Sequence, residues 1–330
     1  MKVSELTVLF PFHKMNSYMY EAVNSLLNST IRTQIIFIDD TPTQSAKIRD
    51  LTGTENQLWK ILKTGGGQGY GEALRIGSLE VDSRLMALFN SDDLISPQKF
   101  EIQLEKLGKS EISLTGIQRI NKNGKELRSM TFLPRGLFYD PIFLFLGSYG
   151  ADATWLMKTD WWREHVLFDS RECLDWRIAL KNFHGARISY VPEKLYFYRK
   201  HPHQVTAKKD IGAEKMLPVY QEWKNFAQIR GLPECSYETF AALSTPWNSK
   251  SKINIAEFEF FCRDLIKIAG TLPQGIRDDV ENIIRRRYLM LLKNQKLDLK
   301  VLSILYRGRR QAIPMWQDLT SNFINNHVLN

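Results

Sequence analysis

The chain has 330 residues, of which 43% are hydrophobic and 25% charged. At roughly 150 residues per domain, this length predicts two domains or one large domain with an appendage, and the composition excludes disordered and fibrous classes. The net charge of +9 favours anionic partners, such as nucleotide phosphates, nucleic acid or an acidic membrane surface.

Cysteine is rare in this sequence. Cys173, Cys235 and Cys262 are too few and too far apart for a disulfide framework or a zinc site. Their thiols are therefore expected to be reduced, as in the cytosol. The first residues lack the apolar segment and cleavage site of a signal peptide, and no apolar run reaches the roughly 18 residues of a spanning helix. These features predict a cytoplasmic protein.

The first 120 residues alternate between two hydrophobic patterns. Short runs rich in β-branched and aromatic residues predict strands, and apolar residues at helical spacing predict helices. The expected strands cover residues 6–10, 35–38, 59–62 and 85–89, and the expected helices cover 18–27, 72–79 and 97–107. This order predicts an α/β fold with a mostly parallel central sheet flanked by helices. In such a sheet, ligands bind beyond the carboxyl ends of the strands.

The pattern changes beyond residue 110. Residues 110–205 are mixed, and their apolar segment Leu137–Tyr149 is too short to span a bilayer, which leaves core, lid or acceptor-side surface as its role. After residue 210, the expected elements are helices, over 213–230, 256–269 and 277–294. Residues 263–310 hold 12 Lys or Arg and 5 Asp or Glu, a net charge of +7, so most of the basic excess lies in the helical part.

Acidic pairs follow two of the expected strands. Asp39-Asp40 ends the second strand, where a carboxylate can accept a hydrogen bond from a nucleobase or a ribose hydroxyl. Asp92-Asp93 ends the fourth, where a carboxylate can hold Mg²⁺ or Mn²⁺ together with substrate phosphates. Both pairs are also compatible with ordinary turns and helix caps.

A glycine-rich run extends from Gly65 to Gly71. It lacks the Gly-Lys-Ser/Thr of a Walker A loop, and it follows the third expected strand rather than the first. It therefore indicates close approach of the backbone to a ligand, and not a dinucleotide fingerprint.

Two later segments carry groups suited to catalysis. Glu172 or Asp175 is suited to act as a general base, or only to cap the helix that follows. In the segment Tyr196–His203, either histidine is a candidate metal ligand, and Arg199 or Lys200 is suited to neutralise a diphosphate. The alternative for this segment is a strand edge with solvated ends.

The order and spacing of these motifs resemble family 2 of the glycosyltransferases, the inverting enzymes of GT-A fold. The resemblance covers roughly residues 5–207. It rests on a strand ending in Pro-Phe, a helix, a strand ending in Asp-Asp, a glycine-rich segment, the region of the metal-binding carboxylate, the region of the base, and a closing Tyr-Arg-x-His strand. These are, in order, Phe10–His13, Glu21–Thr30, Ile35–Pro42, Gly65–Gly77, Leu88–Gln103, Val166–Leu180 and Leu195–Thr206.

The resemblance implies a nucleotide-sugar donor, usually UDP-linked, with Mn²⁺ or Mg²⁺ as cofactor. It assigns Asp92 and His201 to the metal, and Asp175 as the base that deprotonates the acceptor hydroxyl. Either Asp39 or Asp40 would bind uracil and ribose. The residues expected to contact the donor are Pro11, Phe12, Asp39, Asp40, Gly67, Arg75, Asn90, Ser91, Asp93 and His201. The implied reaction is a single displacement at the anomeric carbon with inversion.

By the same resemblance, residues 1–209 form a GT-A catalytic domain and residues 210–330 a helical region. The implied enzyme is a hexosyl- or N-acetylhexosaminyl-transferase of surface polysaccharide biosynthesis, acting on a glycan or lipid-linked glycan. The helical region would contact the acceptor, a second subunit in a homodimer, or the inner face of the membrane. Val280, Ile283 and Ile284 lie at helical spacing before three arginines, which fits a membrane-surface helix or, in the preferred interpretation, a helix packed on protein.

Two positions depart from the family pattern. Asn90 stands where the family has aspartate, and Leu174 stands where it has glutamate before the base, with Glu172 as the fallback base. Two other functions compete. A sugar nucleotidyltransferase would need a glycine-rich loop with Arg and Lys after the first strand, where residues 12–16 contain no glycine. A non-catalytic nucleotide- or nucleic-acid-binding protein would need a recognisable motif, and none is found.

Overall fold

The computed structural model describes residues 5–42, 52, 58–127, 142–146, 151–166, 174–202, 204, 213–244 and 253–294. The strands are β1 (Leu6–Phe12), β2 (Gln34–Asp39), β3 (Trp59–Lys63), β4 (Leu85–Leu88), β5 (Leu94–Ile95), β6 (Ile112–Asn121), β7 (Leu156–Lys158) and β8 (Ile188–Lys200). The α-helices are α1 (Ser17–Leu27), α3 (Tyr70–Leu79), α4 (Lys99–Leu107), α5 (Ile142–Leu146), α6 (Thr159–His165), α7 (Leu174–Asn182), α8 (Ala213–Arg230), α9 (Tyr237–Ser244), α10 (Ile255–Ala269) and α11 (Gln274–Asn294). Two short 3₁₀ helices are η1 (Asp152–Thr154) and η2 (Phe183–Gly185).

All the strands belong to one eight-stranded sheet of order β3-β2-β1-β4-β7-β6-β8-β5. Strands β1 to β4 run parallel to one another, as predicted. The short β7 is antiparallel to both β4 and β6, so it joins this parallel half to the long parallel pair β6 and β8. The predicted α/β fold is thus confirmed, with an antiparallel strand at the centre of the sheet.

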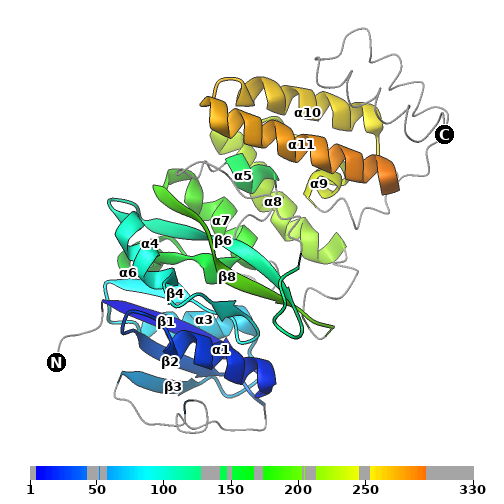
Figure 1. The fold of residues 1–330 in the computed structure, drawn as a ribbon. Coiled ribbons are helices and arrows are strands. Elements are labelled where there is room, and N and C mark those ends of the chain that lie inside the picture. The colour runs from blue at the N-terminus through cyan, green and yellow to red at the C-terminus, as the bar shows by residue number, and fades with distance from the viewer. Residues whose placement is uncertain are drawn as a thin grey trace.

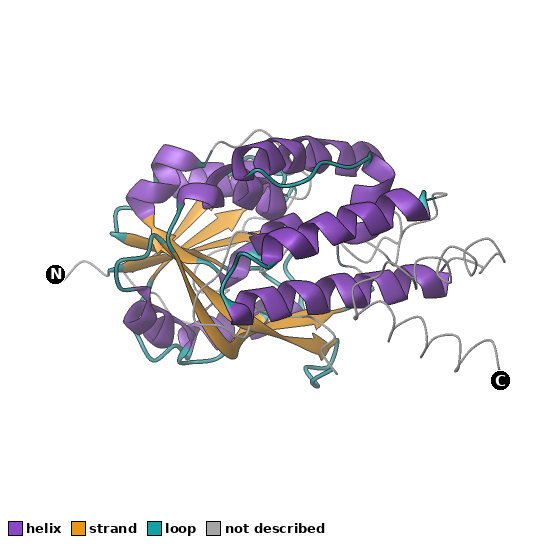
Figure 2. Cartoon of the chain, turned by 90° about the horizontal axis from the view of Figure 1, so that it is seen from above, coloured by secondary structure: helices purple, strands orange, loops and turns teal. Residues whose placement is uncertain are grey.

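Helices cover both faces of the twisted sheet, as Figure 2 shows. Strands β1 and β2 are buried along nearly their whole length, which explains their continuous apolar sequences. Alternate residues face opposite sides: Leu9 and Ile36 join the core under α3, whereas Phe10 and Phe37 join the core under α1 and α4.

In Figure 1, the C-terminal helices α8 to α11 lie above α7 and next to α5, and they extend the core on the α3 side. Trp223, Phe240 and Phe258 belong to the same hydrophobic cluster as the residues of the sheet. The apolar positions of α11 that suggested an amphipathic helix, Val280, Ile283 and Ile284, are 0%, 2% and 0% exposed. They therefore face protein, although the boundary between residues 209 and 210 stays a prediction.

Most predicted elements are found within a few residues of their expected ends. Strand β1 continues through Pro11, because β4 pairs with β1 only as far as Leu9 and Pro11 needs no amide hydrogen on that side. Within the expected apolar segment, residues 142–146 form α5, and the rest lies outside the described residues.

Two findings bear on cysteine and membranes. Cys235 and Cys262 are free thiols, and Cys173 lies outside the described residues. Among the helices that the structure describes, none combines the length and the apolar composition needed to cross a bilayer.

Candidate functional site

The carboxyl ends of β1, β2 and β4 meet at one edge of the sheet, here called the carboxyl edge. Phe12 at the end of β1 is the register partner of Asp39 at the end of β2. The amide of Asp40 donates to the carbonyl of Phe12 at 2.9 Å. Asn90 follows β4, and Pro11 and Phe12 are buried within β1. The fold therefore brings the predicted residues of three separate strands together.

The carboxylate of Asp40 holds the glycine-rich loop that follows β3. Its Oδ1 accepts hydrogen bonds from the Gln68 amide at 2.8 Å and from the Thr64 hydroxyl. Its Oδ2 accepts from the Gly69 amide at 2.8 Å. Asp40 is only 4% exposed, and both oxygens are engaged within the protein. Asp40, one of the two aspartates expected to bind uracil and ribose, therefore holds this loop in place.

The loop itself requires glycine. Gly66 has φ +89°, and a Cβ there would lie 2.7 Å from Pro42 Cα and from the Thr41 carbonyl oxygen. Gly67 has φ +67°, and its amide donates to the Asp40 carbonyl at 2.9 Å. Because L-residues other than glycine rarely adopt such backbone angles, the glycine run is explained by the path of this loop.

Three other residues near this edge of the sheet were predicted to contact the donor, and their surroundings differ: Asp39, Arg75 and Ser91. Asp39 accepts from the amide and hydroxyl of Thr41 at 3.0 and 2.6 Å, within its own turn. Arg75 lies on the exposed side of α3, where its guanidinium donates to Glu72 at 2.6 and 2.8 Å. Ser91 is half-buried in the turn after β4. Asp39 is thus as buried as Asp40, at 3% exposed, but its given hydrogen-bond partners lie within its own turn.

Asp93 lies inside the protein. Its Oδ1 accepts from the Arg199 amide at 2.7 Å, and its Oδ2 contacts the hydroxyl of Tyr196 and, at 3.4 Å, Asn90 Nδ2. Complete burial, and secondly the charge of Asp92, raise the pKa of Asp93 well above its ordinary value. This place differs from the predicted contact with the donor sugar, because the side chain ties β8 to the turn after β4.

Arg199 organises the same turn from behind. Its fully buried guanidinium donates to Glu21 at 2.6 Å, to the Asp92 carbonyl at 2.9 Å and to the Lys122 carbonyl at 3.0 Å. It also lies 4.8 Å from the centroid of the Tyr18 ring. With these partners, Arg199 positions the main chain of Asp92 and is not placed to neutralise a diphosphate.

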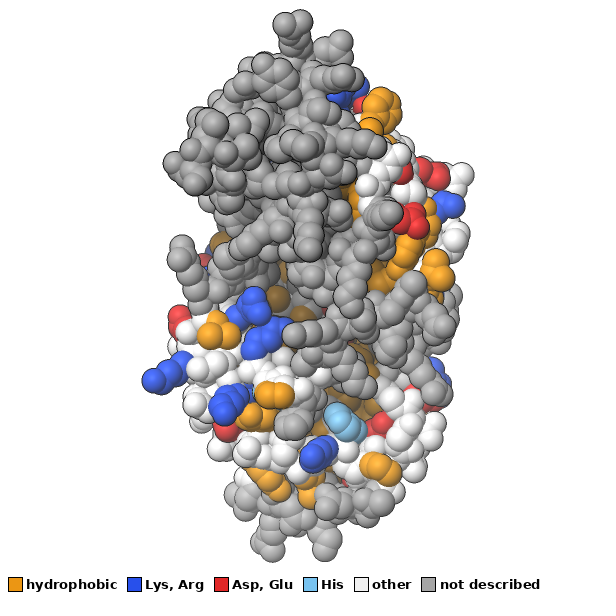
Figure 3. Space-filling model, turned by 90° about the vertical axis from the view of Figure 1, so that its right-hand side faces the viewer, with side chains coloured by type: hydrophobic (Ala, Val, Ile, Leu, Met, Phe, Trp, Pro, Cys, Tyr) orange, Lys and Arg blue, Asp and Glu red, His pale blue; other side chains and the backbone are white. Residues whose placement is uncertain are grey.

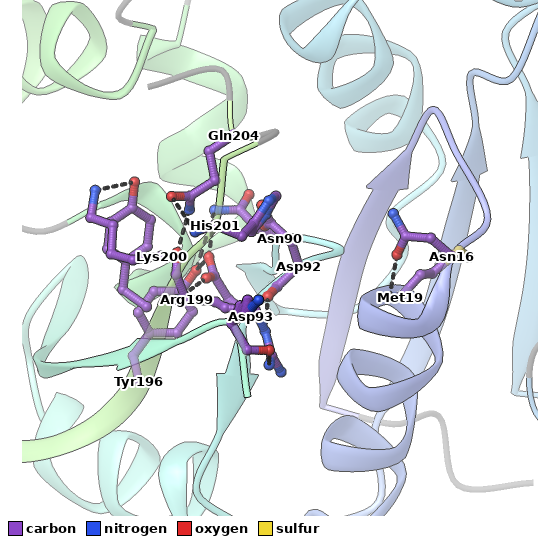
Figure 4. Close-up of polar contacts among 12 residues, drawn as sticks. Asn16, Met19, Asn90, Asp92, Asp93, Tyr196, Arg199, Lys200, His201 and Gln204 are labelled. Carbon is purple, nitrogen blue, oxygen red and sulfur yellow. Dashed lines mark hydrogen bonds and ion pairs between the residues drawn. The ribbon is translucent and has the colours of Figure 1, made fainter. Parts of the chain in front are cut away.

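Asp92 and His201 form the pair predicted for a metal (Figure 4). Asp92 Oδ2 lies 3.0 Å from His201 Nε2, and the Asp92 side chain is 31% exposed against 6% for the imidazole. Gln204 Oε1 accepts from the His201 amide at 3.2 Å, and Tyr18 packs on the ring with centroids 4.7 Å apart. The histidine is thereby held beside the more accessible carboxylate. Within the described ranges, no group of three or more His, Cys, Asp or Glu side chains is arranged to hold a metal ion.

Lys200 is the cation at the end of β8. Its Nζ lies 3.4 Å from the Tyr198 hydroxyl and 4.4 Å from the centroid of that ring. Burial, followed by the charge of Arg119, lowers the pKa of Lys200, whereas Asp93 and Asp92 oppose that shift. Figure 3 shows further basic side chains gathered on the lower, sheet-bearing half of one face. Lys200, rather than Arg199, is therefore the cation of this segment that lies near the acidic turn without a buried ion pair.

Asp152 was missed by sequence reasoning. Its Oδ2 lies 2.7 Å from the Tyr70 hydroxyl, which is also 3.1 Å from Asn90 Oδ1. Burial, and secondly the charge of Asp175, raise the pKa of Asp152 to about 7. The sole sequence signal is an acidic residue between two alanines, which no motif singles out.

Asp175 lies in the first turn of α7 and is half-buried. Its Oδ1 accepts from the Trp176 amide at 2.8 Å, and the Trp176 indole donates to the Leu144 carbonyl at 2.8 Å, which ties α7 to α5. The charge of Asp175 raises the pKa of both Asp152 and Tyr70, so the predicted base lies close to this polar group. The alternatives Glu172 and His203 lie outside the described residues, as does the side chain of Leu174.

The chain is similar to known glycosyltransferases. The family model described as Glycosyl transferase family 2 matches residues 7–159. The chain is 23% identical over 218 residues, 63% of its length, to an "Uncharacterized glycosyltransferase" of Rickettsia bellii (strain RML369-C), and the match spans only 31% of that relative.

Two solved structures share the fold. The crystal structure of S. aureus TarS 1-349 in complex with UDP-GlcNAc has a TM-score of 0.58 at 14% identity, covering 97% of this chain and 92% of that chain. The complex of S. aureus TarS 1-349 with UDP has a TM-score of 0.56 at 13% identity, covering 88% of each chain. These likenesses confirm the predicted GT-A type of α/β architecture, with the C-terminal helices in addition.

Proposed function

We propose that this chain, whose residues 7–159 form a domain of glycosyltransferase family 2, transfers a sugar from a nucleotide-sugar donor to a hydroxyl group of an acceptor. A UDP-sugar is the donor that we infer, since the TarS structures of the same fold were solved with UDP-GlcNAc and UDP. The observation that carries the proposal is the Asp92–His201 pair, 3.0 Å apart at the carboxyl edge. Donors bind at this edge in sheets of this kind.

The side chains of this pair fit a divalent cation. A carboxylate oxygen and an imidazole nitrogen suit Mn²⁺, and the carboxylate also suits Mg²⁺. Two protein ligands leave coordination positions for water and phosphate oxygens, as is usual when a metal is bound together with a nucleotide. When bound, the cation would supply positive charge to the diphosphate. Metal and nucleotide should therefore bind cooperatively.

The residues of the chain then have distinct roles. Asp39 would accept a hydrogen bond from uracil or ribose, because the carboxylate of Asp40 is engaged by the loop amides. Asp175 would remove the proton of the acceptor hydroxyl as it attacks the anomeric carbon, with inversion. Lys200, whose charge is near Asp92 and Asp93, would lie on the side of the departing diphosphate.

Donor binding is tested by calorimetric titration with UDP, GDP, CDP and dTDP, each with and without Mn²⁺. We expect micromolar binding of UDP that depends on Mn²⁺, with weaker binding of the other nucleotides. A selective affinity for another base would correct the donor and keep the proposal. If no nucleotide binds under either condition, the chain has no working donor site, and a scaffold role takes its place.

The base is tested by Asp175→Asn. Its transfer rate should fall about 10²- to 10⁴-fold, the usual contribution of a general base, while UDP affinity is unchanged. The matched control is Asp160→Asn, which alters an exposed carboxylate on α6. Near-normal turnover by Asp175→Asn would move the role to another carboxylate.

Transfer of a hexose or an N-acetylhexosamine, in surface polysaccharide synthesis, is proposed from the family and from the UDP-GlcNAc complex of TarS. Contact with the inner membrane face would have to use basic side chains, because Val280, Ile283 and Ile284 of α11 are buried. Co-sedimentation with anionic vesicles at low and high salt tests that contact, which should weaken steeply with salt.

A further inference from the structure

Asn90 begins the turn that carries Asp92, and Figure 4 shows it among Asp92, Asp93 and Tyr196. Its Oδ1 accepts a hydrogen bond from the Tyr70 hydroxyl at 3.1 Å. Its Nδ2 donates to the Tyr196 hydroxyl at 3.2 Å and to Asp93 Oδ2 at 3.4 Å. Both ends of this half-buried carboxamide are therefore engaged within the protein.

The partners of Asn90 come from separate parts of the fold. Tyr70 begins α3, immediately after the glycine-rich loop that Asp40 holds, and its hydroxyl also lies 2.7 Å from Asp152 Oδ2 in η1. Tyr196 belongs to β8 and is fully buried. Asn90 thus joins the turn after β4 to the segment after β3 and to β8.

The same turn is also held through its main chain. The carbonyl of Asn90 accepts from the Asp93 amide at 3.5 Å. Asp93 Oδ1 accepts from the Arg199 amide at 2.7 Å, and Arg199 Nε donates to the Asp92 carbonyl at 2.9 Å. With the main chain of the turn fixed in this way, the Asp92 carboxylate is left to face His201 and solvent.

The contacts of Asn90 need a group that accepts and donates at once. A carboxamide does both, whereas a carboxylate only accepts. Aspartate at this position could accept from Tyr70 but could not donate to Asp93, and two carboxylate oxygens would face each other where the 3.4 Å hydrogen bond is now. Like charges this close, in a partly buried setting, are unfavourable.

We propose that Asn90 is a positioning residue for Asp92, and that its carboxamide fixes the turn after β4 against Tyr70 and Tyr196. The inference rests on the proposed function, in which Asp92 binds a metal together with the donor diphosphate. Asn90 acts through the turn and does not contact the cation. The departure from the aspartate of the family pattern then has a structural reason, because one side of Asn90 meets a hydroxyl donor and the other a carboxylate.

The role is tested by moving the carboxamide across its contact with Asp93. At pH 8, Asn90→Asp should lower the melting temperature by about 2 °C or more, and should reduce the gain in UDP affinity on adding Mn²⁺ about fivefold. Adding Asp93→Asn restores one amide and one carboxylate across the same contact, in reversed order, and should recover most of both losses.

Two results of this exchange would overturn the role. One is a Mn²⁺-dependent gain that Asn90→Asp keeps or increases, as a carboxylate that contacts the cation directly would do. The other is a loss that Asp93→Asn does not recover, because the two side chains would then act independently.

Tyr70→Phe tests the same contact from outside the turn, and also serves if Asn90→Asp does not fold. It removes the hydroxyl that donates to Asn90 and leaves the turn itself unaltered. UDP affinity without Mn²⁺ should be kept, while the gain on adding Mn²⁺ should fall about threefold. An unchanged gain would overturn the proposal.

Matched controls are Asn123→Asp and Tyr20→Phe, which make the same chemical changes in exposed side chains and should alter neither quantity. A failure of the proposed function gives a different result. If the wild-type chain shows no Mn²⁺-dependent binding of UDP, the metal-assisted donor site is wrong. The melting temperatures of the exchange variants then still decide whether Asn90 holds the turn, because they need neither metal nor nucleotide.

Discussion

The dipeptide Asp-Asp follows both β2 and β4 at the same edge of the sheet. The second aspartate of each pair is buried, but the two have different hydrogen-bond partners. After β2, the carboxylate of Asp40 accepts hydrogen bonds from two loop amides and a threonine hydroxyl. After β4, Asp93 meets one amide, a tyrosine hydroxyl and a distant carboxamide, and its pKa is raised well above the ordinary range. One aspartate therefore accepts hydrogen bonds on both carboxylate oxygens from the loop that it holds, whereas burial and the charge of Asp92 raise the pKa of the other.

The first member of each pair differs as well. Asp39 is 3% exposed and contacts Thr41, whereas the Asp92 side chain is 31% exposed and contacts His201. In both pairs, the second aspartate anchors a segment that is remote in the sequence. Adjacent aspartates at a strand end thus divide into an anchor and a ligand candidate, and the anchors differ in their hydrogen-bond partners.

The substitution of aspartate by asparagine should lower the free energy of unfolding more at Asp40 than at Asp93. Asp40→Asn replaces an oxygen that accepts from a loop amide by an NH₂ group that donates, so two donors would face each other. Loss of hydrogen bonds to a buried charge costs about 1.5–3 kcal/mol each, so the free energy of unfolding should fall by about 3 kcal/mol or more. Urea denaturation measures this, and a loss below about 1 kcal/mol would contradict the anchoring role of Asp40.

A smaller loss is expected from the loop that Asp40 holds. Gly66→Ala places a methyl group 2.7 Å from Pro42 Cα and the Thr41 carbonyl, at a positive φ of +89°. Strain of this kind costs about 1–3 kcal/mol. The control is Gly65→Ala, which shares the positive φ of +91° but has no atom within 4 Å of its Cβ. Denaturation midpoints that fall equally for both variants would show that contact with the turn after β2 is unimportant.

The exposed aspartate of the β4 pair should affect binding and not folding. Asp92→Ala leaves the Asp92 carbonyl available to Arg199, so the melting temperature should stay near that of the wild type. The gain in UDP affinity on adding Mn²⁺, expected to be at least about tenfold, or about 1.4 kcal/mol, should disappear. Calorimetry with and without Mn²⁺ measures it, and an unaltered gain would remove Asp92 from the metal site.

The sequence was informative where a pattern has one structural cause. Continuous apolar runs mark β1 and β2 because both faces of these strands are covered, and α8 has the ends that its apolar spacing predicts. The acidic pairs were located for the same reason, since strand ends can be read from where the apolar runs stop. Asn90, Asp92 and His201 are accordingly brought together as the motif order suggests.

Pairing of side chains across long sequence separations could not be predicted in this way. Tyr70 and Asp152 are 82 positions apart, and Asp93 and Tyr196 are 103 apart, so nothing local distinguishes an anchor from a ligand. Arg199 looked as suited to a diphosphate as Lys200, because the partner that engages it, Glu21, belongs to α1. The antiparallel β7 was missed because it is only three residues long.

The smallest effect is expected at Asp93, whose pKa is raised well above its ordinary value by burial and by the charge of Asp92. In Asp93→Asn, Oδ1 can still accept from the Arg199 amide and the new NH₂ group can donate to the Tyr196 hydroxyl. At pH 7 in metal-free buffer, the free energy of unfolding should therefore change by less than about 1 kcal/mol, in contrast to Asp40→Asn.

The sign of the change in the free energy of unfolding of Asp93→Asn should also depend on pH. An acid whose pKa is raised on folding loses stability as pH rises above its unfolded value, so the variant should become relatively more stable from pH 5 to pH 8. If Asp93→Asn instead costs as much as Asp40→Asn, and the cost grows with pH, the pKa of Asp93 is not raised on folding, and the contrast between the ends of β2 and β4 lies only in their neighbours.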